Sequence, residues 1–193
     1  LATGWREEDY VVAGKPYAGR GKRLDADIEY MQRAWRGELV EGATKKLTPT
    51  PTNGESVPLV FGGTAPAVFA RAARYGVGWT AGGASPDEVK GHFDSARAAW
   101  TAAGREGTPR LWALTYFTLG AGGRETATAY LSDYYGDWGP GMAMGIPADA
   151  DGIRAAVDAF AASGADELIF DPVSSDLGQL ELLADALGDR LKG

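Results

Sequence analysis

Short apolar segments alternate with amphipathic helical segments along most of the chain, and this alternation limits the possible folds more than any other feature. It predicts strands at 57–61, 77–81, 110–119 and 166–172, with helices between them. Strands that alternate with helices are typical of parallel βαβ units. The strands are nearly continuous in apolar residues, as in sheets covered on both faces. A (β/α) barrel and a doubly wound sheet both fit this order.

The helices have clear local signals. Residues 20–36 place Leu24, Ile28, Met31 and Trp35 on one stripe, which predicts an amphipathic helix. "SPDE" at 85–88 predicts a helix start with a capping box. Two segments predict irregular structure. The polar segment 37–56 predicts a long loop, with a small hairpin as an alternative, and we interpret the glycine-rich segment 136–147 as a mobile loop.

Composition excludes several classes of protein. The net charge of −7 argues against nucleic acid or an anionic membrane as the main partner. The chain has no cysteine, so disulfides and thiolate nucleophiles are excluded. No apolar stretch is long enough to predict a membrane-spanning helix. The only histidine, His92, falls within a predicted helix, where we expect a solvated side chain. We expect no metal site, because no group of residues has the spacing of metal ligands.

Two predicted strands end in residues with small side chains or none, just before a helix. Gly62, Gly63 and Thr64 follow the first, and Ala81, Gly82 and Gly83 follow the second. Glycines at such a position expose backbone N–H groups beside the positive end of a helix, which is an arrangement that binds phosphate. Glycine also suits strand–helix turns for steric reasons alone. The residues by themselves leave both interpretations open.

Four segments together resemble the luciferase-like monooxygenase family, whose members are flavin- or deazaflavin-dependent oxidoreductases on a TIM-barrel scaffold. The segments are "GWREEDY", "RGKRLDADIEYMQRAWRG", "VPLVFGGTAPAVFARAARYGVGW" and "GADELIFDP", in family order over nearly the whole chain. The resemblance implies that 1–193 is a single domain, the C-terminal part of a TIM (β/α)8 barrel that lacks the first three to four strands. A natural shortened paralogue is the alternative.

The resemblance also implies a function. We expect an oxidoreductase or monooxygenase that acts on a small organic substrate with FMN, or alternatively with a deazaflavin. In this family the two glycine loops commonly bind the cofactor phosphate, so Gly62, Gly63, Thr64, Ala81, Gly82 and Gly83 become candidate cofactor residues. We expect a cytoplasmic homo-oligomer, with a flavin reductase as a candidate partner. A non-catalytic flavin-binding or structural paralogue is the rival prediction.

Other candidate residues follow from position. In the family the opening loop faces the cofactor cleft, so Trp5 and Tyr10 are candidate substrate contacts. Asp171 lies where barrel active sites lie, but an Asp before Pro172 is more typical of a turn. No residue is assigned to catalysis, because the family's polar residues closest to the chemistry commonly belong to the absent strands.

Overall fold

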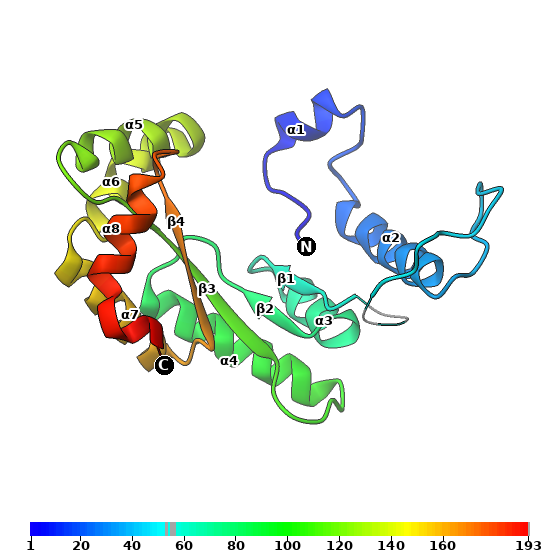
Figure 1. Cartoon of the computed structure of the whole chain (residues 1–193). Helices are drawn as coiled ribbons and strands as arrows, with labels where there is room; N and C mark the ends of the chain where they lie inside the picture. The colour runs from blue at the N-terminus through cyan, green and yellow to red at the C-terminus, as the bar shows by residue number, and fades with distance from the viewer. Residues whose placement is uncertain (53, 55–56, 193) are drawn as a thin grey trace. The chain divides into compact units, whose positions relative to one another are not determined.

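The computed structural model describes residues 1–52, 54 and 57–192, and it shows an α/β protein (Figure 1). The strands are β1 (Val60–Gly62), β2 (Gly78–Thr80), β3 (Arg110–Phe117) and β4 (Glu167–Pro172). The helices are α1 (Glu7–Val12), α2 (Arg20–Trp35), α3 (Pro66–Tyr75), α4 (Pro86–Ala102), α5 (Gly123–Tyr135), α6 (Gly139–Gly145), α7 (Ala150–Ser163) and α8 (Gly178–Leu187), with 3-10 turns η1 (Gly136–Trp138) and η2 (Gly188–Lys192).

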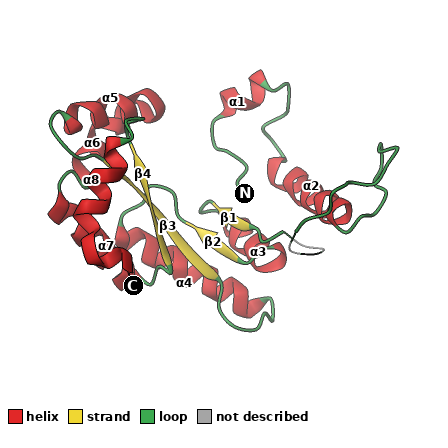
Figure 2. Ribbon diagram, viewed as in Figure 1, coloured by secondary structure: helices red, strands yellow, loops and turns green. Residues whose placement is uncertain are grey.

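The four strands form one sheet in the order β1-β2-β3-β4, drawn in yellow in Figure 2. β3 and β4 are parallel, with Trp112 opposite Glu167 at one end and Phe117 opposite Pro172 at the other. The predicted strands and their sequential order are confirmed, although β1 and β2 are each only three residues long. The carboxyl ends of β1 and β2 therefore lie next to the two glycine loops expected from the sequence.

The chain divides into two compact units. Unit 1 contains residues 1–79 and 95–110, and unit 2 contains residues 80–94 and 111–193. Unit 1 therefore carries α1, α2, β1 and α3, and unit 2 carries most of β3 together with β4 and α5 to α8. The prediction of a single domain over 1–193 stays a prediction.

In unit 1, α2 and α3 are joined by a buried arginine. Arg71 of α3 is 7% exposed, and its guanidinium pairs with Asp25 and donates to the carbonyl of Gly21 at 3.1 Å. Gly78 marks another close contact, because a Cβ there would lie 2.0 Å from the carbonyl oxygen of Arg110. A side chain at this position would force the backbones apart, so glycine is required by packing.

In unit 2, the core lies between β3 and the helices α7 and α8. Phe117 is fully buried with Leu119, Ile153 and Ala186. Its ring meets Phe170 of β4 edge to face at 5.9 Å. The side-chain amide of Gln179 exchanges two hydrogen bonds with the backbone of Leu119, each 2.9 Å long. This buried pair fixes the start of α8 beside the end of β3.

Two predictions of local structure need correction. Segment 136–147 is largely helical, as η1 and α6, because Gly139 lets α6 approach α5: a Cβ there would lie 2.3 Å from the Ser132 nitrogen. The opening loop contains the short helix α1, whose first turn holds Glu7, Glu8 and Asp9. Among the described residues of 37–56, no helix or strand forms, as predicted.

Candidate functional site

The first glycine loop follows β1 in unit 1. Gly62 is the last residue of β1, and its N–H donates to the carbonyl of Leu1 at 3.0 Å. The next three N–H groups, of Gly63, Thr64 and Ala65, donate to no residue that the structure describes. These three residues are exposed. The loop therefore presents three consecutive backbone donors, although Gly62 itself is not one of them.

The loop has a fixed backbone conformation. Gly63 has φ +123°, a region that residues with a side chain rarely adopt. Its carbonyl accepts a hydrogen bond of 2.9 Å from the indole Nε1 of Trp79. A valine at position 63 would therefore strain the backbone, and an added Cβ would lie 3.3 Å from a methyl group of Val68. Glycine here serves backbone geometry, which does not conflict with anion binding.

The helix after this loop begins without a side-chain cap. The N-cap residue of α3 is Ala65, which has extended backbone and no side-chain group that could accept from the first turn. Pro66 occupies the first turn, as predicted, and no acidic residue lies in that turn. Pro66 has no N–H, and the Val68 N–H donates to the Ala65 carbonyl at 2.8 Å, so among the described residues the Ala67 N–H and the positive end of the helix dipole are left for another partner.

The second glycine loop follows β2 and has fewer available donors. In unit 2 the Ala81 N–H donates to the Trp112 carbonyl at 2.9 Å, and the Gly83 N–H donates to the Leu114 carbonyl at 3.3 Å. Both amides thus extend the pairing with β3. Only Gly82 keeps a backbone N–H without a partner among the described residues.

The helix after the second loop is already capped. The hydroxyl and N–H of Ser85 donate to the Glu88 carboxylate at 2.7 and 2.9 Å, and these hydrogen bonds lower the pKa of Glu88. The first turn of α4 contains Asp87 as well as Glu88. Ser85 and Glu88 form the predicted capping box. The carboxylates of Asp87 and Glu88 would repel a phosphate at this helix start.

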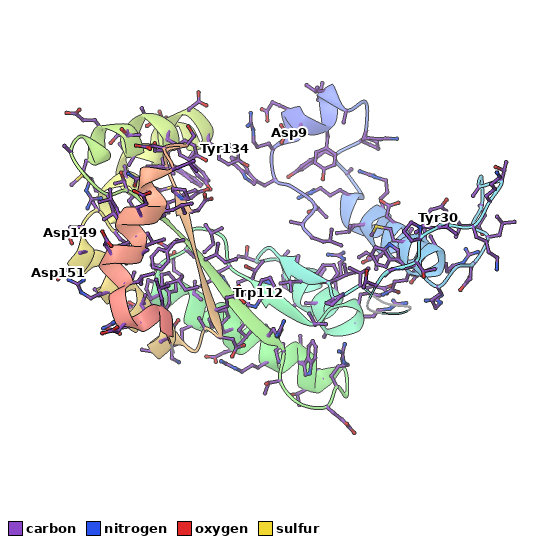
Figure 3. The ribbon with its side chains drawn as sticks, viewed as in Figure 1. Asp9, Tyr30, Trp112, Tyr134, Asp149 and Asp151 are labelled. Carbon is purple, nitrogen blue, oxygen red and sulfur yellow. The ribbon has the colours of Figure 1, made fainter. Side chains whose placement is uncertain are left out.

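A cavity of about 550 Å³ lies beside the second loop within unit 2. Gly83 lines it, and a Cβ at Gly83 would contact Tyr116 at 3.6 Å. Small residues of α7 form another wall, and that helix is capped by Asp149, which accepts from the Gly152 N–H and is labelled in Figure 3. The cavity is mostly apolar, with Ser85, Thr115, Arg124 and Asp149 as its polar members besides Tyr116.

The two candidate substrate contacts occupy different environments in unit 1. Tyr10 lines a cavity of about 560 Å³, and its ring meets Tyr17 edge to face at 5.2 Å. Trp5 is 57% exposed and does not line this cavity. The hydroxyl of Tyr17 donates to the Trp5 carbonyl, which ties the two segments together. Three basic residues, Lys15, Arg20 and Arg23, line the cavity with Asp9 and Asp27.

Unit 2 also pairs Asp171 with a tyrosine that the sequence pattern did not assign to the site. Tyr116 and Asp171 are register partners on β3 and β4, and the Tyr116 hydroxyl lies 3.0 Å from that of Tyr135. Burial raises the pKa of both Tyr116 and Asp171. Within the described residues, no side-chain hydrogen bond to the backbone supports the turn role expected for Asp171. Asp176 takes that role by accepting from the Gly178 N–H. The signal available was position alone, since both residues lie at strand carboxyl ends.

Neither a membrane-spanning helix nor a metal-binding cluster occurs among the described residues. None of the helices there is long and apolar enough to cross a membrane. Within the same residues, no three His, Cys, Asp or Glu side chains gather as a metal site would need.

Comparison with known proteins identifies the family. The model of the luciferase-like monooxygenase family matches residues 1–181. Uncharacterized proteins of Mycobacterium tuberculosis and Mycobacterium bovis are 40% identical over 89 residues. This match covers 42% of the present chain and 30% of the length of those relatives.

Several solved structures share the fold. An F420-dependent secondary alcohol dehydrogenase, solved with an F420–acetone adduct, has a TM-score of 0.73 at 14% identity over 96% of this chain and 67% of its own. The F420-dependent tetrahydromethanopterin reductase of Methanopyrus kandleri has a TM-score of 0.72 at 14% identity, over 95% of this chain and 71% of the reductase. The monooxygenase RslO1 of Streptomyces bottropensis has a TM-score of 0.69 at 16% identity, over 98% of this chain and 67% of the monooxygenase.

These structures are luciferase-like TIM-barrel enzymes, and the present chain is shorter than they are. The predicted fold class is therefore confirmed. With the family model matching almost the whole chain, the protein belongs to the luciferase-like monooxygenase family.

Proposed function

We propose that the protein is an oxidoreductase that binds the phosphate of a flavin or deazaflavin at the loop after β1. The observation that carries this proposal is the run of three N–H groups at Gly63, Thr64 and Ala65 that have no partner among the residues the structure describes. They precede a helix start that has neither a side-chain cap nor an acidic residue. Converging N–H groups at such a helix start suit an anion with several oxygens.

The Thr64 side chain adds a hydroxyl to this site. Thr64 is exposed and lies between the two other donors, so its hydroxyl could donate to the same phosphate. Gly62 supports the site through its bond to Leu1 and not as a donor. Of the candidates Ala81, Gly82 and Gly83, only Gly82 keeps an available amide among the described residues, because the other two amides are already used within unit 2.

The cofactor, when bound, would supply the redox chemistry, while the protein supplies binding and orientation. We propose FMN as the cofactor, with the deazaflavin F420 as the alternative. A phosphate site does not distinguish them, because both carry a phosphate. We further propose a small organic substrate contacted by Tyr10 and Trp5, a flavin reductase partner if FMN is used, a homo-oligomeric assembly and a cytoplasmic location.

The test is a comparison of phosphorylated and unphosphorylated cofactors with the full-length protein. Flavin fluorescence would give dissociation constants for FMN and for riboflavin, which differ only in the phosphate. We expect FMN to bind at least about 10-fold more tightly, corresponding to about 1.4 kcal/mol. Equal affinities would contradict a phosphate site. Stronger binding of F420 than of FMN would select the deazaflavin.

A further inference from the structure

Trp79 is the one side chain that directly fixes the orientation of the Gly63–Thr64 peptide among the described residues. It lies in β2 and is 1% exposed. Its ring packs on Phe69 of α3, with ring centroids 5.5 Å apart. Its indole Nε1 donates to the Gly63 carbonyl at 2.9 Å, across sixteen residues of sequence. All three residues belong to unit 1.

This bond also determines where the next N–H points. The Gly63–Thr64 peptide is trans, because Thr48–Pro49 is the only cis peptide bond among the described residues. In a trans peptide the C=O and N–H groups point in opposite directions. Since the Gly63 carbonyl points at the buried indole, the Thr64 N–H points away from it. Both Gly63 and Thr64 are exposed, so that N–H is directed toward the loop's outer side.

Glycine at position 63 makes the indole necessary. Gly63 has φ +123° and no side chain, so its backbone torsions are less restricted than those of other residues. A contact from elsewhere in the unit is therefore needed to hold the peptide in one orientation. An indole N–H inside a protein needs an acceptor, and the Gly63 carbonyl is that acceptor here. The bond therefore satisfies the tryptophan and selects one orientation of the peptide.

We propose that Trp79 is a positioning residue for the cofactor phosphate. It does not touch the phosphate; it holds the Gly63–Thr64 peptide so that the Thr64 N–H faces the anion. The inference rests on the proposed function, since it requires a phosphate at this loop. It predicts that the preference for FMN over riboflavin depends on the indole N–H of Trp79.

The test substitutes Trp79→Phe, which keeps an aromatic ring and removes the N–H. The matched control is Trp100→Phe in the same unit, because the Trp100 Nε1 also donates to a backbone carbonyl, that of Glu106, at 3.2 Å. Dissociation constants for FMN and riboflavin are measured by fluorescence for the parent and both variants. We expect Trp79→Phe to weaken FMN binding by about 10-fold and to leave riboflavin binding unchanged. Trp100→Phe should leave the ratio of the two affinities unaltered.

Each outcome has a distinct meaning. If Trp79→Phe weakens FMN and riboflavin equally, or neither, Trp79 is only structural and the inference is overturned. If the parent itself binds FMN no better than riboflavin, the proposed phosphate site is contradicted, whatever the effect of Trp79→Phe. If Trp79→Phe does not fold, NMR of the parent decides: the Trp79 indole N–H signal should shift on adding FMN and not on adding riboflavin. An indole signal that responds alike to both would overturn the inference.

Discussion

The two glycine loops look alike in the sequence, yet they differ in the property that matters for binding an anion. After β1, three consecutive N–H groups lack partners within the described part of the chain, and the helix start has neither a side-chain cap nor an acidic residue. After β2, two of three amides are already bonded, and the helix start carries a capping box and two carboxylates. A glycine-rich strand end is therefore not sufficient evidence for a phosphate site. What distinguishes the two loops is whether the protein itself satisfies the donors.

The comparison predicts its largest effect at Ala65, the N-cap of α3. Asp at this position should cap the helix and stabilise the protein by about 0.5–2 kcal/mol. It should also repel a phosphate, since two like charges about 4 Å apart cost roughly 4 kcal/mol near a protein surface. We expect Ala65→Asp to raise the melting temperature and weaken FMN binding by at least about 100-fold.

Ala65→Asn is the matched control, because Asn caps as well as Asp and carries no charge. It should stabilise the protein similarly and weaken FMN binding much less. Thermal unfolding and flavin fluorescence measure the two effects separately. If Ala65→Asp binds FMN as tightly as Ala65→Asn, no anion lies at the start of α3, and the difference between the loops has no functional meaning.

The next effect is expected at Thr64. Thr64→Ala removes a hydroxyl that we propose donates to the phosphate, a bond to a charged group worth roughly 1.5–3 kcal/mol. FMN affinity should fall by about 10- to 100-fold, and riboflavin affinity should not change. Thr64→Ser keeps the hydroxyl and should restore most of the binding. A Thr64→Ala variant that matches the parent for FMN would remove the hydroxyl from the proposed site.

The two loop glycines should respond oppositely to alanine. Gly63 has φ +123°, so Gly63→Ala should destabilise the protein by about 1–3 kcal/mol. At Gly82 a Cβ would meet nothing within 4 Å and the φ lies outside the left-handed region, so Gly82→Ala should be tolerated or gain about 0.4–1 kcal/mol. Chemical denaturation measures both. Equal losses at the two positions would mean that backbone conformation does not separate the loops.

The smallest effect is expected at the capping box of α4. Ser85→Ala should cost about 1 kcal/mol near neutral pH and leave FMN affinity unchanged. The pKa of Glu88 is lowered by the Ser85 hydrogen bonds, so this stabilisation is present above the unfolded pKa of Glu and is lost as pH falls through the lowered folded pKa. Unfolding at about pH 7 and about pH 3 should show the difference between parent and variant shrink.

Glu88→Gln completes this test. Gln can still accept from Ser85, but it removes one negative charge from the start of α4. We expect no change in FMN affinity. A clear rise would show that the second helix start also acts on the phosphate, and the contrast between the loops would then be one of degree.

Much of the fold could be predicted because it depends on local pattern. The order of strands and helices, the Ser85–Glu88 capping box and the proline in the first turn of α3 are all written in short stretches of sequence. Segment 136–147 was wrongly predicted as irregular, because its glycines indicate a loop by propensity. Its helical form depends on the close approach of α6 to α5 at Gly139. This is a packing contact between two helices, which residue propensities do not describe.

The candidate site divides in the same way. Sequence alone indicates that two strands end in glycine before a helix, that the chain resembles the luciferase-like family, and that α4 begins with acids. The folded structure is needed to say which backbone donors remain available, because a hydrogen bond to Leu1, Trp112 or Leu114 depends on which segment lies alongside. It also brought Trp79 to the Gly63 carbonyl and Tyr116 beside Asp171. Backbone N–H groups are identical in every residue except proline, so their availability can be known only once their neighbours are placed.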